Sequence, residues 1–141
     1  MEIMTEGEWR DFVLQGTRTA KVAVTRKDGT PHVTPVWFVM DGDEIVFNTG
    51  AATVKGRALA RDPRVALCVE DDMPPYAFVA IEGTATLSDD TAAMLPLSTA
   101  IGARYMGPDR GEEFGRRNAV PGELLVRVRV DKVVAQRDLA V

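Results

Sequence analysis

Short runs of β-prone residues separated by Asp-Gly turns are the feature that most limits the folds open to this chain. Three such runs occupy residues 20–25, 32–40 and 44–49. Asp28-Gly29 lies between the first two runs and Asp41-Gly42 between the second and third. Because Asp-Gly is a strong signal for a tight β-hairpin, the three runs predict an antiparallel meander.

Three further strands and four helices complete the expected architecture. The strands are predicted at residues 65–70, at 77–87 with a bulge at Glu82-Gly83, and at 124–134, where apolar and polar residues alternate. The helices are predicted from the Thr5–Glu8 capping box to about Gly16, at 52–62, from Asp90 to about Gly102, and at 112–117. Six mainly antiparallel strands with few helices favour a small, closed or partly closed β-barrel, formed by a single domain over residues 1–141.

The amino-acid composition of the chain argues against several classes of function. The net charge is -4, whereas a nucleic-acid-binding protein needs a basic surface. One Cys and one His exclude an internal disulfide and a Cys- or His-rich metal site, and they favour a reducing, cytoplasmic location. No apolar run reaches the ~18 residues of a membrane span. If the chain is an enzyme, we expect a bound cofactor to supply the chemistry.

Residues 48–64 are the segment most suggestive of a binding site. Asn48 and Thr49 end a predicted strand, and Thr53 then caps a helix whose first turns carry Lys55, Arg57 and, one turn on, Arg61. Cations near a helix N-terminus oppose the helix dipole, while free backbone N–H groups there attract anions. A bound phosphate or carboxylate would make this arrangement favourable. The alternative is a basic helix surface that faces solvent.

The neighbouring run His32–Phe38 has two interpretations. Pro35 cannot donate to a strand ladder, so its backbone is a candidate for contact with a planar ligand, while Trp37 and Phe38 are more simply read as core. His32 is either an exposed residue at a strand end or a proton donor. Tyr76, which follows two prolines, is either a residue at the edge of the core or a stacking residue at a pocket mouth.

Two stretches of the sequence together resemble the pyridoxamine 5′-phosphate oxidase-like flavin proteins, which are split β-barrels. The first joins Lys21-Val22-Ala23-Val24-Thr25 to Asp28-Gly29-Thr30-Pro31-His32-Val33-Thr34-Pro35-Val36-Trp37-Phe38. The second, Val54-Lys55-Gly56-Arg57-Ala58-Leu59-Ala60-Arg61-Asp62-Pro63-Arg64-Val65, is similar to the actinobacterial branch that uses the deazaflavin coenzyme F420.

This resemblance implies a homodimer with cofactor sites at the subunit interface. The ring system would lie near the backbone of Pro35, Val36 and Trp37 and near Asn48 and Thr49. Lys55 and Arg57 match phosphate-contacting positions, with Arg61 a further candidate. Tyr76 and Ala77 would come from the other subunit.

The leading functional hypothesis is hydride transfer from reduced F420 to an electron-poor small organic substrate. Solvent, Tyr76 or His32 would supply the proton. The alternatives are an FMN-dependent flavoprotein of the same fold, a protein that binds the cofactor without turnover, and a dimeric barrel without a small ligand.

Overall fold

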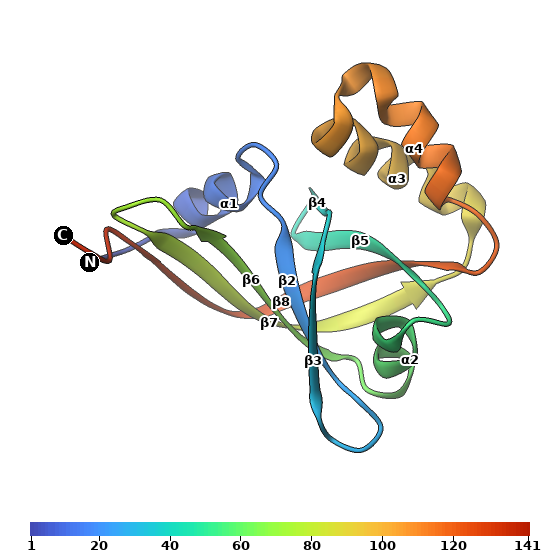
Figure 1. Cartoon of the computed structure of the whole chain (residues 1–141), viewed down its shortest axis with the longest axis horizontal. Helices are drawn as coiled ribbons and strands as arrows, with labels where there is room; N and C mark the ends of the chain where they lie inside the picture. Colours follow the sequence, from blue (N-terminus) through green and yellow to red (C-terminus); the bar gives the residue numbers. More distant parts are fainter.

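The computed structural model describes residues 1–141 as one antiparallel sheet with helices at its periphery (Figure 1). The strands are β1 (Glu2–Ile3), β2 (Ala20–Thr25), β3 (Pro31–Val36), β4 (Val39–Asp41), β5 (Glu44–Gly50), β6 (Arg64–Asp71), β7 (Ala77–Ser88) and β8 (Glu123–Arg137). The helices are α1 (Glu6–Leu14), α2 (Val54–Arg61), α3 (Thr91–Met106), the short 3-10 helix η1 (Pro108–Arg110) and α4 (Gly111–Asn118). None of these helices combines the length and apolar character needed to cross a membrane.

The strand order shows how the sheet is rolled. Strands pair in the order β3-β2-β6-β7-β8-β5-β4, with β1 added beside β8. The edge strands β3 and β4 are separated in sequence only by Trp37 and Phe38, a link that reaches about 10 Å when extended. The two edges of the sheet must therefore lie close together, although no ladder joins them.

The mainly β architecture with peripheral helices confirms the expected fold class, but the sheet has eight strands rather than six. The prediction of one strand over residues 32–40 was wrong, because the chain breaks at Trp37-Phe38 into β3 and β4. The two-residue strand β1 was not predicted. The long ladder between β7 and β8 does contain the predicted bulge, at Glu82/Gly83.

The core fills the inside of the rolled sheet. Its largest fully buried side chains include Phe38, Phe47 and Ile81. Helix α1 contributes Trp9 and Val13 to the same cluster. The predicted capping box holds the start of this helix: the Glu8 N–H donates to Thr5 Oγ1 at 3.3 Å, and the Thr5 N–H donates to Glu8 Oε1 at 3.0 Å.

The helical hairpin of α3 and α4 lies beside β4 and β5 (Figure 1). Helix α3 continues to Met106, four residues past the predicted end at Gly102. Gly102 marks a close helix–helix approach rather than a helix end, since a Cβ there would lie 2.6 Å from Phe114 Cβ. The last turn of α3 therefore extends to the Trp37-Phe38 break, where the side chains of Arg104 and Tyr105 bind the Phe38 backbone.

Candidate functional site

A cavity of about 300 Å³ lies where the end of β3, the end of β5 and the start of α2 meet the α3–α4 hairpin. It brings together six of the residues predicted to contact a cofactor: Pro35, Val36, Trp37, Asn48, Thr49 and Lys55. Three further residues complete its lining: Ile101, Asn118 and Glu123. We call this space the Lys55 cavity.

The Trp37 ring is held against the helical hairpin. It stacks on Tyr105 with ring centroids 5.2 Å apart and meets the edge of Phe114 at 5.9 Å. With both aromatic contacts directed to the hairpin, the ring serves mainly to pack the wall. Pro35, which is exposed, leaves the backbone at the end of β3 accessible.

The start of α2 offers unused hydrogen-bond donors. Thr53 caps the helix by accepting from the Gly56 N–H at 3.1 Å, as the sequence predicts. The backbone N–H groups of Val54 and Lys55 are the first two of α2 and therefore have no acceptor within the helix. The Lys55 ammonium donates to Thr34 Oγ1 at 2.8 Å, and burial lowers the pKa of this amine.

The cations of this helix are not neutralised by the protein. No carboxylate lies within ion-pair distance of Lys55, Arg57 or Arg61. Asp62, the nearest acid in sequence, instead pairs with Arg64 at 2.7 Å, and that hydrogen-bonded contact lowers its pKa to about 2. Positive charge combined with free N–H donors suits an anionic ligand.

Asn48 and Thr49 are fixed from behind the cavity. Ser98, which is fully buried in α3, donates its hydroxyl to Asn48 Oδ1 at 2.8 Å. The Asn48 amide donates in turn to the Leu124 carbonyl at 3.5 Å. The Thr49 and Thr53 hydroxyls lie 3.1 Å apart. These contacts give the wall of the cavity a defined set of polar groups.

Glu123 is the functional candidate that the sequence analysis missed. Its Oε2 atom is buried and has no hydrogen-bond partner. Burial raises the pKa of this carboxyl, and the backbone N–H of Leu124 partly offsets the rise. In the sequence the residue lies just before the alternating strand predicted at 124–134, so its place in the lining of the Lys55 cavity has no local signal.

Six predicted site residues lie outside the lining of the Lys55 cavity. One of them, Thr53, contacts the lining residue Thr49 through its hydroxyl. Arg57 and Arg61 are exposed along α2. His32 sits near the start of β3, with its Nδ1 3.0 Å from Arg26 Nη2. Within one chain, therefore, the structure does not bring His32 to the cavity.

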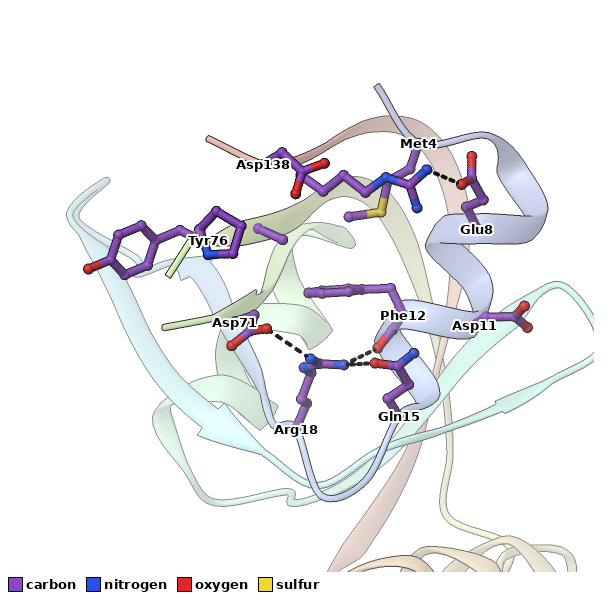
Figure 2. Close-up of a pocket in the computed structure, with 12 residues that line it drawn as sticks. Met4, Glu8, Asp11, Phe12, Gln15, Arg18, Asp71, Tyr76 and Asp138 are labelled. Atoms are coloured by element: carbon purple, nitrogen blue, oxygen red, sulfur yellow. Dashed lines mark hydrogen bonds and ion pairs between the residues drawn. The ribbon is translucent and has the colours of Figure 1, made fainter. Parts of the chain in front are cut away.

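Tyr76 and Ala77 line a second pocket of about 380 Å³ between α1 and the β6–β7 turn (Figure 2). Tyr76 has a positive φ of 65° and lies at the outer edge of this pocket, as Figure 2 shows. Inside the pocket, Arg18 donates to Gln15 at 2.6 Å and to Asp71 at 3.3 Å. Some of the polar groups of this pocket are thus bonded to one another.

The site carries no pair of nucleophile and base. Cys68 is half-buried in β6, and burial raises the pKa of its thiol, which disfavours the reactive thiolate. No three His, Cys, Asp or Glu side chains gather as a metal site. The chemistry that this arrangement supports is the binding and orientation of an anionic ligand.

Solved structures with the same fold extend these observations. The conserved hypothetical protein Rv2991 from Mycobacterium tuberculosis is 31% identical, with a TM-score of 0.84 over 99% of this chain and 89% of that one. An F420 reductase is 24% identical, with a TM-score of 0.68 over 87% of this chain and 94% of that one. The heme storage protein HutZ from Vibrio cholerae is 17% identical, with a TM-score of 0.72 over 96% of both chains. Comparison with curated proteins gives no match.

The family model described as pyridoxamine 5′-phosphate oxidase matches residues 5–137. That span contains every strand from β2 to β8 and the whole Lys55 cavity. The split-barrel fold expected from the sequence is thereby confirmed. The chain belongs to the pyridoxamine 5′-phosphate oxidase family.

Proposed function

We propose that this protein is an F420-dependent oxidoreductase that transfers a hydride from the reduced deazaflavin to an electron-poor small organic substrate. The observation that carries the proposal is the uncompensated charge of α2: Lys55 reaches the Lys55 cavity, while no carboxylate pairs with it. The F420 reductase among the structural neighbours supports the choice of cofactor. FMN is the alternative, because its phosphate would suit the same donors.

The residues present fit such a cofactor. The free N–H groups of Val54 and Lys55 and the Lys55 ammonium would hold the phosphate. The backbone from Pro35 to Trp37, together with Asn48, would orient the ring. When bound, the deazaflavin supplies the hydride. The chain's own part is to bind, to orient and to keep water from the reacting face.

The exposed cations of α2 extend the site toward solvent. Arg57 and Arg61 are exposed and have no ion-pair partner. We assign Arg57 to the phosphate and Arg61 to the anionic oligoglutamate tail of F420. Arg64 is a weaker candidate for the tail, since it is engaged by Asp62.

We further propose that two copies form a homodimer in which Tyr76 and Ala77 complete the partner's site. The supporting observation is an apolar area on the outside of the sheet, where Val33 and Val134 are 62% and 42% exposed. Both line a hollow of about 410 Å³ that also includes Lys132 and Glu82. A surface that combines exposed apolar side chains with both a positive and a negative charge can be complementary to the same surface on a second copy of the chain.

The dimer makes a direct prediction. Val33→Lys places a charge within this apolar area, and we expect it to shift the protein from dimer to monomer. Because Val33 is exposed in the single chain, the unfolding temperature of the monomer should change little. Sedimentation velocity measures the assembly state. A wild-type protein that sediments as a monomer would contradict the proposed dimer.

Lys55→Met tests the phosphate site. We expect the variant to bind F420 about tenfold or more weakly, because a charge-assisted hydrogen bond contributes ~1–3 kcal/mol. Titration followed by cofactor fluorescence measures the affinity, with FMN titrated in parallel. Lys27→Met, at an exposed position of the β2–β3 hairpin, is the matched control and should bind like the wild type. Equal affinities of the Lys55 variant and the wild type would remove Lys55 from the site.

A further inference from the structure

Glu123 occupies a defined place in the Lys55 cavity. It begins β8 and pairs in register with Gly50, where β5 passes into the turn that leads to α2. Its Oε2 packs against that turn, since a Cβ on Gly50 would lie 3.8 Å away. The atom is buried, yet no donor of the protein reaches it. A carboxylate oxygen without a donor is costly to bury.

The cavity also contains a cation that does not neutralise this carboxylate. The Lys55 ammonium donates to Thr34 on β3, and no ion pair joins it to Glu123. The other polar residues of the lining, Asn48, Thr49 and Asn118, are uncharged. One cavity therefore presents a cation and a carboxylate on different elements, and neither forms an ion pair with the other or with a further residue.

We propose that Glu123 accepts a hydrogen bond from an O–H or N–H group in the phosphate-free part of the bound cofactor. This inference rests on the proposed function and deepens it. The Lys55 cavity would then recognise a ligand that is anionic at one end and a hydrogen-bond donor at the other. Lys55 and the start of α2 bind the phosphate, and Glu123 selects the sugar-alcohol chain or ring that follows it.

A role in binding explains why the chain carries a glutamate at position 123 that lowers the stability of the ligand-free protein. The pKa of the Glu123 carboxyl is raised in the folded state, so its charged form opposes folding at neutral pH. Replacing the carboxylate with a neutral group should therefore leave the free protein as stable as the wild type or more stable. A residue kept for structure alone would give the opposite result. Binding residues that cost stability are common in functional sites.

The test compares Glu123→Met and Glu123→Gln with the wild type. We expect the affinity to fall about tenfold in the Met variant, equivalent to ~1.4 kcal/mol, and by less in the Gln variant, which keeps an acceptor. The thermal unfolding temperature of both free variants should equal or exceed that of the wild type. Glu112→Met, whose side chain is 81% exposed on α4, is the control and should change neither quantity.

Two pairs of ligands separate the roles of Glu123 and Lys55. One pair is F420 and its phosphate-free deazaflavin core, and the other pair is FMN and riboflavin, which lacks the phosphate of FMN. Glu123→Met should weaken the phosphorylated and phosphate-free members of a pair by the same factor. Lys55→Met should weaken only the phosphorylated member.

The outcomes distinguish the two proposals. If the wild type binds none of the four ligands, the proposed function fails and the role of Glu123 fails with it. If the wild type binds and Glu123→Met binds equally well, only the inference about Glu123 is overturned. A Met variant that loses stability together with affinity would also overturn it, because that result assigns the residue to the fold.

Discussion

Replacing Arg104 with Met is expected to lower the free energy of unfolding by about 3 kcal/mol, among the larger effects of a single substitution. The guanidinium donates to the carbonyl oxygens of Phe38 at 2.7 Å, Val13 at 2.8 Å and Gly16 at 3.0 Å. It also lies over the Phe38 ring, 4.6 Å from its centroid. No carboxylate pairs with it, so these backbone dipoles and ring faces are what stabilise the charge.

Removing the guanidinium leaves several carbonyl groups without donors at one place. Each partly buried acceptor that loses its partner costs ~1 kcal/mol or more. The carbonyls belong to the end of α1, to the following loop and to the break between β3 and β4, so all three segments loosen together. Because Trp37 directly precedes Phe38 and lines the Lys55 cavity, cofactor affinity should fall as well.

Thermal and urea unfolding check this prediction. A loss of ~3 kcal/mol should lower the unfolding temperature by about 10 °C. Arg104→Lys should fall between the wild type and Met, since an ammonium cannot reproduce the planar fork of donors. The control is Arg116→Met on α4, where the side chain is 76% exposed and a change within ~0.5 kcal/mol is expected. Equal stabilities of Arg104→Met and Arg116→Met would contradict the account.

The Arg104 contacts also explain where prediction from the sequence reaches its limit. Hairpins and helix caps depend on neighbouring residues: Thr5, Thr53 and Asp90 all cap helices as their local patterns predict. The break between β3 and β4 has no such local signal, because β-prone residues lie on both sides of it. Arg104 and Tyr105 bind the Phe38 backbone from more than 60 positions away in the chain.

The residues of the candidate site also fall into two groups, those predictable from the local sequence and those that depend on distant packing. Asn48 and Lys55 could be predicted because they lie in one strand–turn–helix segment with a readable charge pattern. Glu123 and Asn118 could not, because they reach the Lys55 cavity only through the pairing of β8 with β5 and the packing of α4. Whether Tyr76 completes the site depends on a second copy of the chain and stays a prediction.

Gly56→Ala should have the second large effect. Gly56 lies in the first turns of α2, and a Cβ there would overlap the Gly50 carbonyl oxygen and lie 3.1 Å from Ala51 Cα. Both neighbours are backbone atoms of the turn between β5 and α2, so no side chain can rotate away. We expect a loss of about 3 kcal/mol in stability, at the upper end of the cost of overpacking. The N-terminus of α2 would move away from the turn, so F420 affinity should also fall.

The sign of this effect separates packing from helix propensity. Ala is better than Gly in a helix interior by ~1 kcal/mol, so propensity alone predicts that Gly56→Ala stabilises the protein. Gly7 in α1 provides the matched control, because a Cβ there meets nothing within 4 Å. Gly7→Ala should therefore raise the unfolding temperature slightly, while Gly56→Ala lowers it by about 10 °C. If both substitutions stabilise the protein, the close approach of α2 to Gly50 is not required for stability. The position of the free N–H donors of α2 beside the Lys55 cavity would then need another explanation.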